Sequence, residues 1–355
     1  MRAVWYDTFG GPVSVREVPS PRPAPHEAVV EVAATGVCRS DWHAWQGHDP
    51  DVSLPHVGGH EFAGVVAEVG AEVRGFRPGQ RVTAPFVHAC GRCAQCARGD
   101  HQICARQTQP GFTRWGSFAE YVVVDHADVN LVLLPDALEF TTAAGLGCRF
   151  GTAYRAVLRQ GRVGAGDWVA VHGCGGAGLS AVEVAVAAGA RVVAVDVSAA
   201  ALDLARALGA AEVVDASIDP EPAAVASVVH DLTDGGARVS LDCLGSPATC
   251  AASVLGLARG GRHVQVGLLH GGATPVPMDR VVAYELDVVG SHGLPAHEYP
   301  AMLGLVTAGR LRPDRLVGKL IDLADVPNAL AAMSPNGPRL GLPGAGMTVA
   351  VLSQV

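Results

Sequence analysis

The sequence predicts an α/β protein in which a β-rich region is joined to a doubly wound parallel sheet. Three observations predict this. Short apolar runs separated by turn residues fill roughly the first 150 residues, strands and helices alternate from about residue 165 to 290, and the pattern is mixed again after that. A length of 355 residues also fits two domains better than one.

The β-rich region is expected to contain many short strands joined by long loops. Apolar runs at residues 28–33, 64–69 and 121–124 are typical of strands with at least one buried face. Turn-forming residues interrupt them at 19–25, which is rich in proline, and at 77–79.

From residue 168 onward the predicted strands and helices alternate. Strands are expected at 168–172, 191–195, 212–214, 239–241, 263–266 and 287–289, and helices at 177–188, 199–208, 221–230, 247–258 and 301–308. Ser198 is suited to cap the second helix and Gly209 to end it. Helices of this length between strands favour a mostly parallel sheet. We therefore expect domain boundaries that divide the chain into residues 1–150, 151–290 and 291–355.

Composition argues against several classes of function. The 34 acidic and 26 basic residues give a net charge of −8, which does not suit a protein that binds nucleic acid through a cationic surface. No run of apolar residues is long enough to predict a membrane span, and residues 1–12 lack the apolar block of a signal peptide. Four of the nine cysteines are clustered, which is typical of a reducing compartment and predicts a cytoplasmic protein.

A glycine-rich loop follows the strand predicted at 168–172. Gly173, Gly175 and Gly178 form a G-x-G-x-x-G pattern, with Gly176 inside it, and a helix is expected next. Such glycines permit a tight turn, close approach of a pyrophosphate to the backbone, and tight packing of helix on strand. The helix N-terminus then offers N–H groups to the phosphates. The loop predicts a dinucleotide site; the alternative is that these glycines only form turns.

An acidic residue strengthens this prediction. Asp196 lies 23 residues beyond Gly173, at the end of the second predicted strand. A carboxylate there accepts hydrogen bonds from both ribose hydroxyls and repels a 2′-phosphate, which favours NAD over NADP. The next residues, Val197 and Ser198, include no Arg or Lys that could hold the extra phosphate.

A second motif consists of four cysteines within 15 residues. Cys90, Cys93, Cys96 and Cys104 have the short spacings that wrap a loop around a tetrahedral zinc ion. A site of four thiolates has no open position, so we expect a structural zinc in a lobe at about residues 88–106. Unmetallated thiols and an iron–sulfur cluster are the alternatives.

Other candidate ligands are scattered before residue 151. They lie in the segments GVCRSDWH (36–43), GGHEFAG (58–64) and GLGCRFG (145–151). Taken singly, each of Cys38, His60 and Cys148 could be an ordinary buried residue. Their spacing in the sequence does not show that they lie together in the fold.

Taken together, these motifs have a familiar order. The sequence resembles the zinc-dependent, medium-chain alcohol dehydrogenases over nearly its whole length, through GVCRSDWH, GHEFAG, the four-cysteine lobe, the glycine loop and the acid after it. The resemblance implies a GroES-like catalytic domain, completed by the C-terminal segment, and a Rossmann domain that binds NAD(H). It also implies two zinc ions per chain, one catalytic and one structural.

The resemblance assigns roles to residues around the catalytic zinc. Cys38, His60 and Cys148 correspond to its ligands, which leave the fourth position open. Glu61 corresponds to an acid that lies near the metal and assists ligand exchange. Asp41 corresponds to a carboxylate that orients His60.

Further roles follow from the same resemblance. Ser40 corresponds to the hydroxyl that takes the alcohol proton, and His43 to the imidazole that passes this proton toward solvent. Arg39 corresponds to a contact of the cofactor pyrophosphate. Arg149 has no role that the sequence assigns.

The substrate pocket is expected to be apolar and aromatic. Phe86, Trp42 and Trp115 correspond to segments that line or cap the cleft, and Leu268 follows the strand end near which the nicotinamide should lie. For each tryptophan the alternative is a place in the core. Such a pocket suits medium-sized or aromatic primary or secondary alcohols and aldehydes. The resemblance makes polyols less favoured, since polyol-oxidising members of the family often carry Glu where Cys148 stands. The Gly- and Pro-rich stretch 333–346 departs from the family and receives no function.

The sequence therefore predicts reversible hydride transfer between an alcohol and NAD, with a small-molecule alcohol or aldehyde as substrate and no nucleic acid or membrane as partner. One alternative is a carbonyl or enoyl reductase of the same superfamily that works without catalytic zinc. Another is a non-catalytic nucleotide-binding protein that keeps only the structural zinc. A homo-oligomer is expected, with a tetramer favoured over a dimer.

Overall fold

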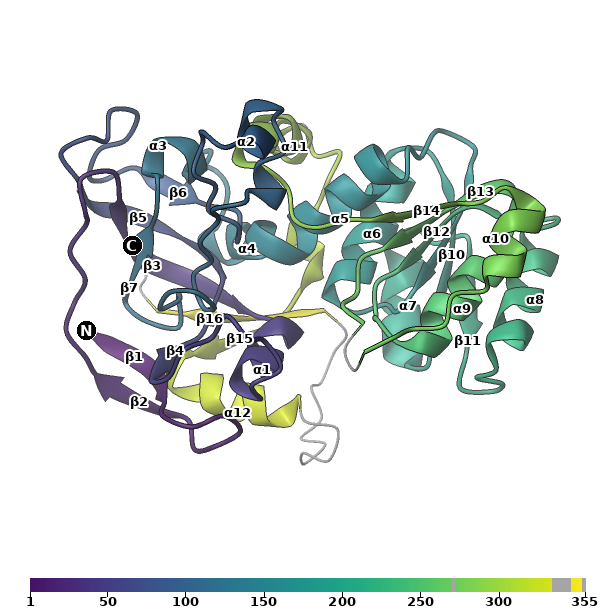
Figure 1. Ribbon diagram of the computed structural model, residues 1–355, viewed down its shortest axis with the longest axis horizontal. Helices are drawn as coiled ribbons and strands as arrows, with labels where there is room; N and C mark the ends of the chain where they lie inside the picture. Colours follow the sequence, from purple (N-terminus) through teal and green to yellow (C-terminus); the bar gives the residue numbers. More distant parts are fainter. Residues whose placement is uncertain (270–271, 334–345, 353–355) are drawn as a thin grey trace.

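The computed structural model describes residues 1–269, 272–333 and 346–352. The Gly- and Pro-rich stretch 333–346 therefore lies almost wholly outside the described residues. The chain forms a β-rich part and a part built on a parallel sheet, which are arranged side by side in Figure 1. The predicted α/β class is confirmed.

The β-rich part contains two sheets. A seven-stranded sheet has the order β15-β16-β3-β5-β6-β8, with β7 also paired to β3. Its strands are β3 (Ala28–Val37), β5 (Glu61–Val69), β6 (Arg81–Thr83), β7 (Tyr121–Val124), β8 (Val132–Leu133), β15 (Val317–Asp322) and β16 (Met347–Val351). A three-stranded sheet is formed by β1 (Arg2–Tyr6), β2 (Ser14–Glu17) and β4 (His56–Val57). β16 pairs antiparallel with β3, so a segment that follows the parallel sheet in the chain completes the seven-stranded sheet.

The parallel sheet contains six strands in the order β11-β10-β9-β12-β13-β14. They are β9 (Trp168–His172), β10 (Arg191–Asp196), β11 (Glu212–Asp215), β12 (Ala237–Asp242), β13 (Leu257–Gln265) and β14 (Asp287–Gly290). Its helices are α6 (Gly176–Ala187), α7 (Ala199–Ala207), α8 (Pro222–Leu232), α9 (Pro247–Leu255) and α10 (Met278–Tyr284). This strand order is that of a doubly wound sheet, whose ligands bind at the carboxyl ends of the strands. The sequence missed α10 and placed the end of α9 too late, because Gly256 caps that helix and β13 begins at once.

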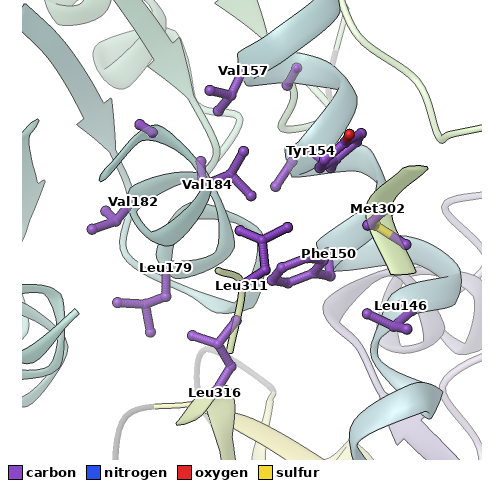
Figure 2. Packing of buried hydrophobic residues seen from close by; sticks show 14 of the residues in the cluster. Leu146, Phe150, Tyr154, Val157, Leu179, Val182, Val184, Met302, Leu311 and Leu316 are labelled. Atoms are coloured by element: carbon purple, nitrogen blue, oxygen red, sulfur yellow. The ribbon is translucent and has the colours of Figure 1, made fainter. Parts of the chain in front are cut away.

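A helical run joins the two parts, and the sequence did not predict it. It consists of α4 (Phe140–Ala144), a π-helical turn η2 (Leu146–Phe150), α5 (Gly151–Arg155) and a second π-helical turn η3 (Ala156–Gln160). Leu146 and Phe150 of this run are fully buried in a cluster that includes Leu179 of α6. Figure 2 shows these side chains converging with residues from the C-terminal segment, among them Met302. One core therefore holds the β-rich part against the parallel sheet.

The remaining helices lie mainly in the β-rich part. They are α1 (Arg39–Trp45), α2 (Ala94–Ala97), α3 (Ala127–Asn130), α11 (Tyr299–Thr307) and α12 (Val326–Ala332). Of these, the sequence predicted only α11, shifted by two residues at its start. Within the described residues no helix combines the length and apolar character that crossing a bilayer requires.

Candidate active site and metal centres

The four clustered cysteines form one compact group. The sulfur of Cys93 lies 3.4 Å from that of Cys96 and 3.7 Å from that of Cys104, and all four sulfurs lie within 4.8 Å of one another. Zinc–sulfur bonds of about 2.3 Å place sulfurs of a tetrahedral site about 3.8 Å apart. The cysteines are free thiols. The residues present therefore fit a zinc ion.

Nearby donors favour thiolate at Cys90 and Cys93, whose pKa values lie below the usual value, whereas burial raises the pKa of Cys96 and of Cys104. The backbone N–H of Cys96 lowers the pKa of Cys93 to about 6. The guanidinium of Arg106 donates to the sulfur of Cys90 at 3.5 Å, and backbone N–H groups donate to the sulfur of Cys104. These donors offset the negative charge that four thiolates leave on a bound zinc ion.

A second group lies where three distant segments meet. Cys38 directly follows β3 and is the N-cap of α1, His60 and Glu61 are at the start of β5, and Cys148 is in η2. One ligand atom from each of these four residues lies within 4.8 Å of the others. The fold thus brings together the three residues that the resemblance implied as ligands, with Glu61 beside them. A π-helical turn is a frequent feature of functional sites because it redirects side chains.

His60 is held with one nitrogen free. Its Nδ1 donates to Oδ1 of Asp41 at 2.7 Å, while the other oxygen of Asp41 accepts from the backbone N–H of Cys38 at 2.9 Å. The Nε2 of His60 is buried and has no hydrogen-bond partner among the described residues. An unpaired buried nitrogen costs about 1–3 kcal/mol unless something binds it. Beside two thiols, this nitrogen fits a metal ion.

Arg149, to which the sequence assigned no role, pairs with Glu61. Its Nε lies 3.0 Å and 2.9 Å from the two carboxylate oxygens, and its Nη2 also contacts Glu61. The backbone N–H of Arg149 donates to the same carboxylate at 2.8 Å. Both side chains are buried. The pair also explains two glycines: a Cβ on Gly36 would overlap the Glu61 carboxylate, and a Cβ on Gly176 would come within 2.5 Å of the Arg149 side chain.

The charges of this buried group are coupled. Hydrogen bonding from the thiol of Cys148 lowers the pKa of Cys38 well below its usual value, and the same interaction raises the pKa of Cys148. Burial raises the pKa of Glu61, and the positive charge of Arg149 acts in the opposite direction by lowering it. Arg149 stays protonated throughout, because a guanidinium does not lose its proton in proteins.

Aromatic rings surround His60. Phe86 packs edge-on with its ring centroid 6.1 Å away, and Phe112 lies 5.2 Å away. The sequence predicted Phe86 as a pocket residue but not Phe112, which follows a glycine in a loop without periodicity. The two tryptophans have other ring neighbours, and Trp42 belongs to a buried core cluster, as the alternative for it required. Trp42 is buried against the edge of His43, and Trp115 is 39% exposed against Trp5.

The residues expected to move the proton lie on α1. Ser40 has its Oγ 3.9 Å from the sulfur of Cys38. His43 follows one turn later and is half-buried, and its Nδ1 lies 2.9 Å from Nδ1 of His48. His48 is exposed and was not among the predicted residues. Arg39 is exposed and donates to the carbonyl of Met333 at 2.5 Å.

The glycine loop has the shape that a dinucleotide needs. A Cβ on Gly175, the N-cap of α6, would meet nothing within 4 Å, so this backbone faces open space. A Cβ on Gly178 would overlap the carbonyl oxygen of Gly173, which explains the need for glycine there. Each oxygen of Asp196 accepts one backbone N–H, from Cys174 at 2.6 Å and Ser198 at 2.8 Å, and keeps further lone pairs. Leu268 follows β13 at the carboxyl edge of the parallel sheet, the edge that also carries the glycine loop, and it is 56% exposed.

The chain matches two family models. Residues 24–136 match the alcohol dehydrogenase GroES-like domain, and residues 176–308 match the zinc-binding dehydrogenase domain. An alcohol dehydrogenase of Geobacillus stearothermophilus is 36% identical over 293 residues, which cover 82% of this chain and 84% of the relative. The chain belongs to the zinc-dependent alcohol dehydrogenases.

Other relatives of this alcohol dehydrogenase carry related names. A sorbitol dehydrogenase of Halalkalibacterium halodurans is 33% identical over 313 residues, covering 86% of this chain and 88% of the relative. A solved structure described as an NAD-dependent alcohol dehydrogenase superposes with a TM-score of 0.88 at 32% identity, covering 99% of this chain and all of that chain. The protein is accordingly an oxidoreductase with zinc and NAD as cofactors.

Two glycine substitutions should separate packing from cofactor binding in this alcohol dehydrogenase. Gly178→Ala places a methyl group on the Gly173 carbonyl, so we expect a loss of about 1–3 kcal/mol of stability together with weaker NADH binding. Gly175→Ala has space for its methyl group, so its stability should stay unchanged while NADH binding weakens by about tenfold. Thermal unfolding and NADH fluorescence titration measure both effects. Wild-type NADH affinity in Gly175→Ala would show that the pyrophosphate does not approach this backbone.

Proposed function

We propose that the protein oxidises primary or secondary alcohols to aldehydes or ketones with NAD, and catalyses the reverse reaction. The observation that carries the proposal is the unpartnered Nε2 of His60, buried beside the thiols of Cys38 and Cys148. These three residues would hold the catalytic zinc, and the four cysteines of the lobe the structural zinc. Bound zinc would act as a Lewis acid that lowers the pKa of the substrate hydroxyl.

The chain's own residues position this site. Asp41 holds His60 in the tautomer whose Nε2 carries a lone pair, because its carboxylate accepts a hydrogen bond from Nδ1–H and so keeps the proton on that nitrogen. Ser40 would accept the substrate proton. His43, one helical turn away, would pass it to His48, whose exposed ring lies within hydrogen-bond distance and opens to solvent.

Glu61 and Arg149 act together in this proposal. The guanidinium occupies both carboxylate oxygens, which keeps Glu61 beside the zinc position without leaving an uncompensated buried charge. Arg149 also lies against Gly176 in the cofactor loop. It therefore connects the metal group to the start of α6.

The glycine loop and Asp196 would bind NAD. The backbone at Gly175 has room for the pyrophosphate, and the N-terminus of the 12-residue helix α6 favours its charge. Asp196 would accept the ribose hydroxyls and exclude a 2′-phosphate. Arg39 would contact the pyrophosphate and Leu268 the nicotinamide, as the family resemblance implies.

The substrate pocket is proposed to be walled by Phe86, with Phe112 beside it and Trp42 and Trp115 further out. Phe86 and Phe112 present apolar surface next to His60, which suits an alkyl or aromatic alcohol better than a polyol.

The test of the proposal combines zinc analysis with a panel of alcohols and aldehydes, each assayed with NAD(H) and NADP(H). We expect two zinc ions per chain, turnover of apolar alcohols, and a preference for NAD. Turnover that survives removal of the catalytic zinc by a chelator would instead favour a zinc-independent reductase. One zinc per chain with NADH binding and no turnover would indicate a non-catalytic protein.

Assembly and location are part of the same proposal. Met278 and Val282 of α10 and Val288 of the edge strand β14 are exposed apolar residues near one side of the parallel sheet, which supports a homo-oligomer. We favour a tetramer, which sedimentation analysis would distinguish from a dimer. The nine free thiols fit a reducing compartment such as the cytoplasm.

A further inference from the structure

A third group of potential metal ligands lies apart from the two thiol clusters. It consists of His26, Asp125 and His126, with one ligand atom from each within 4.8 Å of the others. His26 precedes β3, and Asp125 and His126 follow β7, so the pairing of these two strands brings the residues together. The backbone N–H of Ala127 donates to the carbonyl of His26 at 2.9 Å. The scaffold of the group is therefore fixed by main-chain hydrogen bonds.

The donor atoms are spaced as ligands of one ion would be. Nε2 of His26 lies 3.0 Å from Oδ1 of Asp125, and Nε2 of His126 lies 3.9 Å from the same oxygen. Bonds of about 2.0–2.2 Å in a tetrahedral site put neighbouring nitrogen and oxygen ligands about 3.3–3.6 Å apart. The two imidazole rings stack with centroids 4.5 Å apart, and the distances above place Nε2 of each ring near the same carboxylate oxygen. Small side-chain rotations would bring all three atoms to ligand distance.

The two oxygens of Asp125 differ in a way that points to a missing ligand. Oδ2 accepts a hydrogen bond from the hydroxyl of Thr108 at 3.0 Å and lies 3.7 Å from the guanidinium of Arg114. Oδ1, which lies 3.0 Å from Nε2 of His26, is buried and has no hydrogen-bond partner in the part of the chain that the structure describes. Asp125 as a residue is only 8% exposed. A buried carboxylate oxygen left unpaired is costly, and a cation would satisfy it.

We propose that His26, Asp125 and His126 bind a divalent transition-metal ion, a site separate from the catalytic and lobe zincs. Two imidazoles and one carboxylate suit zinc, cobalt, nickel or copper, whereas magnesium and calcium prefer oxygen ligands alone. His26 is 42% exposed at its side chain, so water completes the coordination sphere. Arg114 donates a hydrogen bond to the carboxylate of Glu27 at 2.5 Å. This ion pair partly neutralises Arg114 and so limits its repulsion of the bound cation.

The site would join two parts of the β-rich region. A bound ion links the entry to β3 with the turn between β7 and α3, where Asn130 also anchors the backbone of Asp125 and His126. The site lies on different elements from Cys38, His60 and Cys148. Its role is therefore structural, and loss of the ion should leave alcohol oxidation intact.

The experiment uses the full-length protein with its zinc ions in place. It is dialysed against cobalt chloride, then against metal-free buffer, and its total metal content is measured by mass spectrometry. We expect one metal equivalent beyond the two zinc ions, bound without a thiolate-to-cobalt charge-transfer band because the ligands are nitrogen and oxygen. Excess magnesium should not displace it.

His26→Gln and His126→Gln should each lose the extra equivalent and any cobalt-dependent rise in Tm, with kcat/KM unchanged. His297→Gln is the matched control, because His297 also packs against another histidine, His101, but belongs to no such group in the described chain. It should retain the extra equivalent. The proposal is overturned if the wild-type protein binds no metal beyond its two zincs, or if both variants bind the extra ion as tightly as the wild type.

Discussion

Replacing Cys148 with alanine is expected to lower kcat/KM for alcohol oxidation by at least about 10³-fold, because the metal's contribution to catalysis is several kcal/mol. The substitution removes one of the three donors proposed for the catalytic zinc and leaves the lobe cysteines untouched. Zinc content should therefore fall from two ions to one per chain. Tm should fall by several degrees, because loss of the ion leaves Nε2 of His60 buried without a partner, but the protein should still fold, since the core residues Leu146 and Phe150 remain.

Cys250→Ala provides the control for this result. Cys250 is a free, buried thiol in α9, a helix of the part built on the parallel sheet. It belongs to neither thiol group. It should keep both zinc ions and near wild-type kcat/KM. If Cys148→Ala retained both zincs, or turned over within tenfold of the wild type, the proposed ligand set would be wrong and a zinc-independent reductase would become the better hypothesis.

Sequence patterns were sufficient where the determining residues are neighbours in the chain. Strands β9 and β10 and the helices after them fall close to their predicted bounds, because apolar periodicity and caps such as Ser198 act within a few residues. The cysteine lobe is equally local, since its four ligands span 15 residues. In both cases the local chemistry leaves few alternatives.

The rest depends on contacts between distant segments. Cys38 and Cys148 are 110 positions apart, so only the family resemblance could place them together before the structure was known. The helical run through Cys148 escaped prediction because Gly145, Gly147 and Gly151 interrupt its pattern. Those glycines are required by packing: a Cβ on Gly147 would come within 2.9 Å of the Ala84 carbonyl.

Arg149 shows the same limit most clearly. Its partner Glu61 is 88 positions away, and the two meet only because η2 packs against the start of β5. In the sequence, the sole signal was a charged residue inside an apolar segment next to a predicted ligand. A charge in such a place needs a partner, since charged side chains are rarely buried alone.

Arg149→Met is therefore expected to destabilise the protein by about 3–5 kcal/mol, because it leaves the carboxylate of Glu61 buried without its counter-charge. Methionine retains an unbranched side chain of similar length against Gly176, so packing is largely preserved. The double variant Glu61→Gln/Arg149→Met removes the charge as well, and it should recover much of this loss. Urea unfolding of the four proteins of this cycle gives the coupling energy directly.

The control for this cycle is Arg159→Met. Arg159 also pairs with a glutamate, Glu298, at 3.0 Å, but its side chain is 64% exposed, so the loss should not exceed about 1 kcal/mol. A loss from Arg149→Met as small as this, or additive effects in the cycle, would show that the two buried groups do not depend on each other. Because Arg149 lies against Gly176 as well, the single variant should also bind NADH more weakly than the control. Only a side chain that touches both the acid and the cofactor loop should give both results together.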